Sequence, residues 1–127
     1  MKDAPTAMRG VRGATTAEEN TAAAIVEAAR ELLSTLLKAN QIQAQDVASI
    51  FFTSTADLTS AFPAQAAREL GYSDTPILCS QELPVPGALP RCIRVLLHWN
   101  TARRADEIKH VYLRDAVRLR PDRRWPR

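Results

Sequence analysis

Arg94 is the residue of this sequence whose position most needs a chemical explanation. It interrupts the apolar run CIRVLL at residues 92–97. A guanidinium group is almost never buried without a partner, because losing its hydration is costly. Glu82, in the preceding proline-rich segment, is a candidate partner. The alternative is that Arg94 lies on the solvent side of an edge strand, with His98 and Asn100 on the same face.

Arg12 is a second candidate for binding a ligand. In an extended strand over residues 8–15, alternation places Gly10 and Ala14 on the face of Arg12, whereas Arg9 shares the other face with larger neighbours. The small neighbours leave room for a ligand to lie over Arg12. The alternative is that these glycines mark a bulge or a close packing of the backbone.

Three further side chains carry polar or reactive groups, each with a simpler structural explanation. In an extended strand, the side chain of Tyr112 faces away from those of Val111 and Leu113. The simpler explanation is a core tyrosine whose hydroxyl is hydrogen-bonded. Arg68 is on the polar side of a predicted short helix, where exposure is the common outcome. Cys79 ends a predicted strand, where a thiol more often packs than reacts.

The motifs of metal, nucleotide and covalent catalysis do not occur in the sequence. His98 and His110 are too far apart to form a helical metal-binding pair, and there is no H-E-x-x-H motif or Cys/His cluster. There is also no nucleophile elbow and no glycine-rich phosphate loop; the chain has four glycines in all. An enzyme of this kind would use no cofactor and would act by positioning and fixed electrostatics.

A small set of strands and helices must position these residues. Strands are predicted at residues 8–15, 47–53, 75–79, 91–101 and 111–113, helices at 17–39 and 63–70, and one helical turn at 105–108. Thr16 and Glu19 have the spacing of a capping box at the start of the first helix, and Asn40 is its predicted end. Three prolines and one glycine prevent regular structure over most of residues 80–90. These elements predict one α+β domain.

Composition and charge exclude several classes of protein. The chain has 127 residues, of which 46% are hydrophobic and 24% charged, which is typical of one soluble globular domain. No apolar run approaches the roughly 20 residues of a membrane helix, and the first residues do not resemble a signal peptide. We therefore expect a cytoplasmic protein with no membrane partner. Its two cysteines, Cys79 and Cys92, fit reduced thiols.

The net charge of +3 does not predict a nucleic-acid partner. The last ten residues hold five arginines and one aspartate, so the rest of the chain is close to neutral. Only seven residues are aromatic, which leaves few side chains for stacking on bases. We expect no binding to nucleic acid.

Several short segments together match a known family. They are RGVRGATT (9–16), TADL (55–58), FPAQAARELG (62–71), C-x-Q-E (79–82), CIRVLL (92–97), HVYL (110–113) and LRPD (119–122). The chain resembles the monofunctional chorismate mutases of the AroH class, homotrimeric enzymes that convert chorismate to prephenate in phenylalanine and tyrosine biosynthesis. The resemblance covers a single domain at residues 8–122. It leaves residues 1–7 as an unshared N-terminal extension and 123–127 as a basic tail that we expect to be disordered.

The resemblance implies a fold and a set of binding residues. The fold is a mixed sheet with helices on its outer face, and three subunits form a pseudo-α/β-barrel with active sites in clefts between neighbours. One subunit is expected to contribute Arg12, Cys79, Glu82, Arg94 and Tyr112, with Leu78, Ser80 and Gln81 in the same lining segment. The neighbouring subunit is expected to contribute Phe62, Ala64 and Arg68. Leu119 and Arg120 resemble the family's mobile C-terminal segment near the mouth of the site.

The same resemblance implies a chemistry that suits these residues. The rearrangement of chorismate is a concerted pericyclic step, which needs no acid, base or nucleophile. Arg94 is expected to stabilise the negative charge that grows on the ether oxygen. Arg12 is expected to hold a carboxylate and Tyr112 to add a neutral donor. Glu82 and Cys79 are expected to bind the ring hydroxyl, which fixes the reactive conformer.

The sequence departs from the family pattern at one position near the expected site, and an alternative function remains open. Gln65 stands where some relatives carry lysine, so we expect a loss of affinity more than of turnover. The alternative is a non-catalytic trimer that binds a small carboxylate metabolite, because a fold does not fix a function. The presence of Arg12, Glu82, Arg94 and Tyr112 argues for the enzyme.

Overall fold

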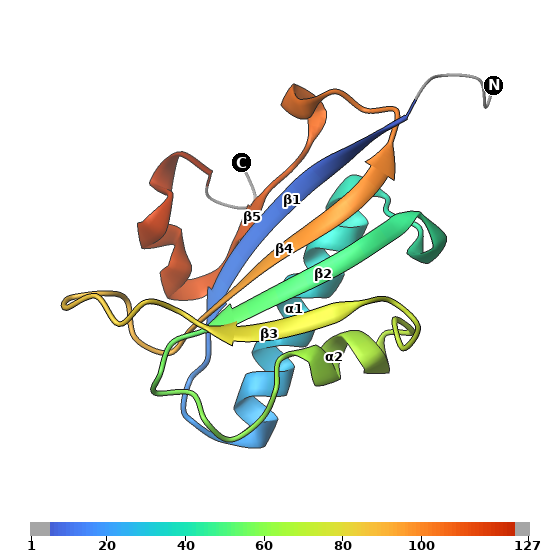
Figure 1. Ribbon diagram of the computed structural model, residues 1–127. Helices are drawn as coiled ribbons and strands as arrows, with labels where there is room; N and C mark the ends of the chain where they lie inside the picture. Colours follow the sequence, from blue (N-terminus) through green and yellow to red (C-terminus); the bar gives the residue numbers. More distant parts are fainter. Residues whose placement is uncertain (1–5, 124–127) are drawn as a thin grey trace.

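A single five-stranded mixed sheet organises the fold (Figure 1). The computed structural model describes residues 6–123. The regular elements are β1 (Ala7–Thr16), α1 (Ala22–Asn40), β2 (Val47–Ser54), α2 (Ala64–Glu69), β3 (Ile77–Gln81), β4 (Cys92–Thr101) and β5 (Val111–Tyr112). Short 3₁₀ helices cover Ala44–Asp46, Ala105–Glu107, Arg114–Leu119 and Pro121–Arg123. Most of the predicted extension at 1–7 and of the predicted tail at 123–127 lies outside the described residues.

The strand order is β3-β2-β4-β1-β5. The pairs β1–β5 and β2–β3 are parallel, and β4 runs antiparallel to both β1 and β2. β4 is therefore the central strand, so the alternative that placed Arg94 on an edge strand is wrong. The predicted mixed α+β sheet is confirmed.

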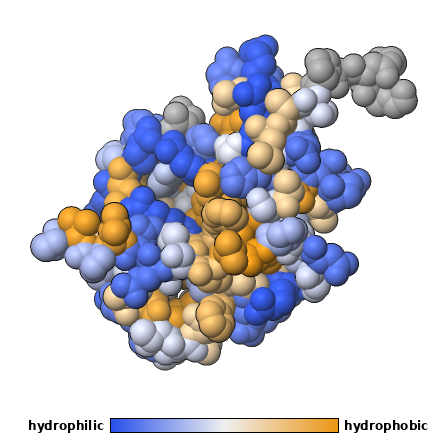
Figure 2. All heavy atoms as spheres, viewed as in Figure 1, coloured by the Kyte–Doolittle hydropathy of each residue, from blue (hydrophilic) through white to orange (hydrophobic). Residues whose placement is uncertain are grey.

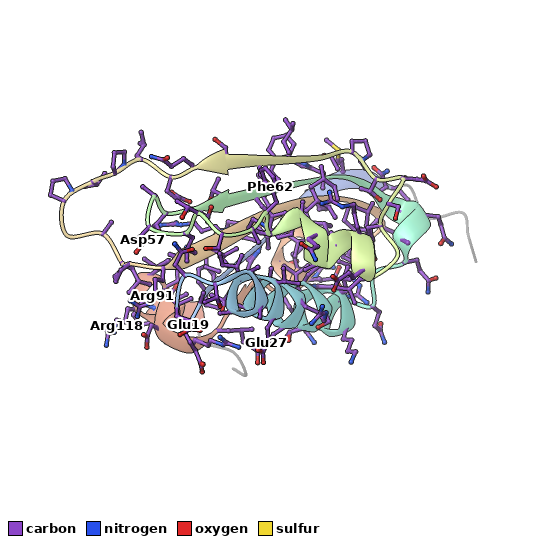
Figure 3. All side chains as sticks on the ribbon, turned by 90° about the horizontal axis from the view of Figure 1, so that it is seen from below. Glu19, Glu27, Asp57, Phe62, Arg91 and Arg118 are labelled. Carbon is purple, nitrogen blue, oxygen red and sulfur yellow. The ribbon has the colours of Figure 1, made fainter. Side chains whose placement is uncertain are left out.

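Both α-helices pack against one face of the sheet, and the opposite face is left open by them (Figure 3). Strand alternation separates the two faces: Val11 and Phe52 are fully buried beneath the helices, whereas their neighbours Arg12 and Phe51 are exposed on the other side. We call this second side the open face. It carries every second residue of β1, β2 and β4.

α1 packs closely on the sheet because its apolar side chains recur at helical spacing. Leu32, Leu33 and Leu36 are fully buried, and burying one such side chain stabilises a fold by about 1.5–3 kcal/mol. Gly13 of β1 permits this close approach. A Cβ atom there would lie 3.0 Å from Leu32 Cδ1 and 3.0 Å from the carbonyl oxygen of Val111.

α1 begins five residues later than the capping-box spacing predicts, so the prediction of Thr16 as its cap is wrong. The N-cap is Thr21, whose hydroxyl accepts the backbone N–H of Ala24 at 3.1 Å. Tertiary hydrogen bonds occupy the residues between: the backbone N–H of Ala17 donates to the carbonyl of Arg91 at 2.9 Å. These long-range bonds keep the chain out of the helix until Thr21.

The other boundaries differ slightly from the prediction. β3 is shifted two residues toward the C-terminus and includes Ser80 and Gln81. Asn40 is the last residue of α1, and the left-handed conformation that ends the helix belongs to Gln41, with φ of 57°. Asn40 is instead fully buried, and its side chain makes two hydrogen bonds with the backbone of Lys109.

Candidate active site

An ion pair between Arg94 and Glu82 stands on the open face. Nε of Arg94 lies 3.1 Å from Oε2 of Glu82, and the hydroxyl of Thr53 donates to the same oxygen. Thr53 of β2 is paired directly with Arg94 of β4, so the register of two central strands brings both donors to one carboxylate. The side chains of Arg94 and Glu82 are 48% and 24% exposed, so the pair is accessible to a ligand. The predicted partner of Arg94 is confirmed.

Arg12 lies on the same face, diagonal to Arg94. Ala14 is paired directly with Arg94, and Arg12 is two residues away along β1, a separation of about 7–8 Å between diagonal neighbours. The backbone N–H of Arg12 donates to Nδ1 of His110 at 3.0 Å. Arg9 projects from the opposite side and is half-buried. The alternation that favours Arg12 over Arg9 is confirmed.

Tyr112 completes this group from the edge strand β5. It is paired with Ala14, and its side chain is buried against Ala14 with Leu119 packed nearby. Arg120 follows Leu119 and forms an ion pair with Asp122, with Nη2 and Oδ2 2.9 Å apart. Asp122 raises the pKa of Arg120, and Tyr112 contributes in the same direction. The C-terminal segment therefore lies beside Tyr112.

A second group of predicted residues lines a groove of about 540 Å³. Phe62 is exposed at this groove, which Cys79, Ser80 and Gln81 line from β3. Figure 3 shows Phe62 near the start of α2. Pro63 and the residues from Ser54 to Ala61, apart from Asp57, complete the lining.

The side chain of Cys79 lies on the helix-covered side of the sheet. Cys79 is paired with Phe52 and packs against the core beneath the helices, whereas Arg94 stands on the open face. Within one chain, the side chains of Cys79 and Arg94 therefore lie on opposite faces of the sheet, and their sharing of one site stays a prediction. Cys79 also lines the groove of Phe62.

The remaining predicted residues lie around these two groups. Leu78 is exposed on the open face, where it is paired with Phe51. Ala64 is buried at the start of α2, and Arg68 is exposed on that helix. The neutral side chain of Gln65 donates a hydrogen bond from Nε2 to Glu69 at 3.1 Å.

Sequence reasoning missed Thr53 and His110. Alternation along residues 47–53 could place Thr53 on the face of Phe51, but only the strand register shows that it meets Glu82. His110 precedes β5, and no local signal indicates that its imidazole accepts the N–H of Arg12.

Both cysteines and the possible metal ligands were located in the described part of the chain. Cys79 and Cys92 are free, and burial raises the pKa of Cys92, which favours the unreactive thiol form. Within residues 6–123 we find no cluster of three or more His, Cys, Asp or Glu residues that could hold a metal ion. No helix in that range is long and apolar enough to cross a membrane.

Comparison with known proteins identifies the family. The chorismate mutase type I family model matches residues 8–123. Chorismate mutase AroH of Thermus thermophilus is 58% identical over 116 residues, covering 91% of this chain and 95% of the relative. The AroH protein of Bacillus subtilis (strain 168) is 42% identical over 116 residues, covering 91% of each. A solved chorismate mutase from Clostridium thermocellum has a TM-score of 0.84 and 46% identity, covering 85% of this chain and 96% of that one. With a family model that matches residues 8–123, relatives of 58% and 42% identity, and the same fold, this chain belongs to the type I, or AroH, family of chorismate mutases.

Proposed function

We propose that this chain catalyses the rearrangement of chorismate to prephenate, a step in the biosynthesis of phenylalanine and tyrosine. The observation that carries the proposal is the ion pair of Arg94 and Glu82 on the open face, with Arg12 and Tyr112 beside it. Two cations, a carboxylate and a phenol suit a dicarboxylate substrate that carries a ring hydroxyl.

In the proposed mechanism, Arg94 acts on the transition state. The ether C–O bond breaks ahead of C–C bond formation, and negative charge grows on the ether oxygen. A preorganised donor aimed at such charge is worth about 3–4 kcal/mol. Nε of Arg94 lies 3.1 Å from Oε2 of Glu82, and this ion pair orients the guanidinium. No covalent intermediate and no proton transfer are needed.

The other residues select the reactive conformer of the substrate. The planar fork of Arg12 binds a carboxylate in two places, which an ammonium group cannot do. Tyr112 adds a neutral donor, and Glu82 accepts the ring hydroxyl. Because both ends of the substrate are held, it binds in one reactive conformer, which lowers the entropic part of the barrier.

We propose a homotrimer in which the active site forms between neighbouring subunits. Among the described residues, Phe62 lies at the groove beside α2 and Arg94 on the open face, which supports a site that a neighbouring subunit completes. The open face also exposes Met8, Phe51 and Leu78, at 59%, 43% and 65%, and Figure 2 shows apolar surface at its centre.

Leu119 and Arg120 would close the mouth of the proposed site, which their position beside Tyr112 supports. The proposed substrate is a soluble dicarboxylate, and two free cysteines suit a reducing compartment. We therefore place the enzyme in the cytoplasm.

The proposal is tested by following the loss of chorismate absorbance with the purified protein, while light scattering gives its oligomeric mass. Acceleration over buffer is the expected result. An intact trimer that binds chorismate without acceleration would instead establish the alternative, a non-catalytic binder of a small carboxylate.

A further inference from the structure

We infer that Thr53 is a positioning residue, which determines which carboxylate oxygen of Glu82 meets the substrate. The inference rests on the proposed function, because it concerns how Glu82 receives the ring hydroxyl. Thr53 itself touches Glu82 and does not contact the reacting atoms.

The hydrogen bonds of Glu82 are distributed unequally over its two oxygens. The hydroxyl of Thr53 and Nε of Arg94 both approach Oε2. Among the described residues, no hydrogen bond is donated to Oε1, whereas Oε2 receives that of Thr53. An ionised carboxylate only accepts hydrogen bonds, and each oxygen has two acceptor positions. Oε1 is thus the oxygen left for a hydroxyl donor.

Thr53 supplies a constraint that the backbone around Glu82 cannot. Glu82 lies just beyond the end of β3, where its backbone N–H donates to the carbonyl of Ser54 at 2.9 Å. That bond fixes the backbone but leaves the side chain free to turn, and the last torsion of a glutamate is broad and roughly two-fold. Two donors from two adjacent strands hold one oxygen in place and so fix the other.

Thr53 also allows Arg94 to contact the substrate without releasing Glu82. In the proposed mechanism, Arg94 must aim at the ether oxygen while it holds Glu82. If Arg94 were the only donor to Glu82, any movement of the guanidinium toward the substrate would release the carboxylate. With Thr53 bonded to Oε2, the carboxylate keeps its orientation when Arg94 adjusts.

Thr53→Val removes the hydroxyl and keeps the branched shape that suits a strand. We expect kcat/KM to fall about tenfold or more, which is the scale of a lost hydrogen bond to a charged group. Thr53→Ser should recover most of that loss. Thr53→Ala provides a second variant without the hydroxyl, should the valine variant fail to fold.

Thr15→Val is the matched control. Thr15 lies in β1, is fully buried, and its hydroxyl has no hydrogen-bond partner among the described residues. The same substitution there should leave kcat/KM at the wild-type value. Melting temperature and oligomeric mass are measured for all variants.

A double-mutant cycle with Glu82→Ala separates positioning from a general structural effect. If Thr53 acts through Glu82, Thr53→Val should lower kcat/KM by less than about twofold once Glu82 is removed. A full tenfold loss in both backgrounds would overturn the inference, as would an unchanged kcat/KM in Thr53→Val. A wild-type protein that does not accelerate the reaction would instead overturn the proposed function.

Discussion

At the scale of single residues, the two arginines of the open face are held in different ways. The guanidinium of Arg94 is tied to Glu82, whereas Arg12 is tied through its backbone N–H to His110 and extends its own side chain into the open. A tethered cation is preorganised, which favours a contribution to the transition state. A freer one suits the capture of a substrate carboxylate, and so binding.

Removing the tethered cation tests the first role. We expect Arg94→Ala to lower kcat by at least about 10²-fold, because a fixed donor to developing charge is lost. Steady-state kinetics measure the change, and circular dichroism checks that the half-exposed site still folds. A kcat close to the wild-type value would show that Arg94 is a solvent-exposed residue without a role in catalysis.

Cys79 tests whether the mechanism is covalent. Cys79→Ser should lower kcat/KM by less than about tenfold, because a hydroxyl replaces one weak hydrogen-bonding group with another and no thiolate takes part. The same chorismate assay measures it. Complete inactivation of a correctly assembled variant would contradict a pericyclic step.

At the scale of elements, one side chain ties α1 to the strand that carries Tyr112. Nδ2 of Asn40 donates to the carbonyls of Leu36 at 3.0 Å and Lys109 at 2.9 Å, and Oδ1 accepts the N–H of Lys109 at 2.8 Å. The chain before β5 is thereby anchored on the end of the helix. Because β5 pairs with β1 at only two positions, this anchor supports a short element.

Asn40→Ala should therefore destabilise the fold by about 2–3 kcal/mol, since three hydrogen bonds from a fully buried side chain to the backbone are lost. Urea unfolding at matched protein concentration measures the change. A loss smaller than about 0.5 kcal/mol, as for an ordinary surface substitution, would show that water replaces the amide.

Thr15→Val should change the free energy of unfolding in the opposite direction from Asn40→Ala. The buried hydroxyl of Thr15 makes no hydrogen bond within the described part of the chain, so its removal should stabilise the fold by up to about 1 kcal/mol. The same urea series measures it. Marked destabilisation would mean that the hydroxyl has a partner in the assembled protein.

At the scale of the whole molecule, the decisive feature is that both helices lie on one side of the sheet. The open face combines the group around Arg94 with exposed Phe51 and Leu78, a combination that one chain leaves in solvent. Large exposed apolar patches mark interaction sites. The proposed catalysis and the proposed assembly would therefore depend on the same surface.

A charge placed on this surface should separate the subunits. We expect Phe51→Glu to reduce the oligomeric mass and to abolish activity, because a carboxylate would be buried without a partner. Lys38→Glu, on the exposed side of α1, is the control and should remain assembled. Light scattering after gel filtration measures both, and an active, fully assembled Phe51→Glu would contradict the proposed interface.

The sequence by itself determined the features that depend on local periodicity. Alternation in β1 separated Arg12 from Arg9, helical spacing identified the buried face of α1, and prolines marked the irregular segment after β3. Each follows from backbone geometry within a few residues. The resemblance of short segments then supplied the family and the candidate residues.

Only the tertiary structure decided the features that depend on register and long-range bonds. It moved the start of α1 to Thr21, made β4 central, and brought Thr53 to Glu82. It also placed Cys79 on the other side of the sheet from Arg94. Strand register and the face that the helices cover are set by packing between distant segments, so no local pattern contains them.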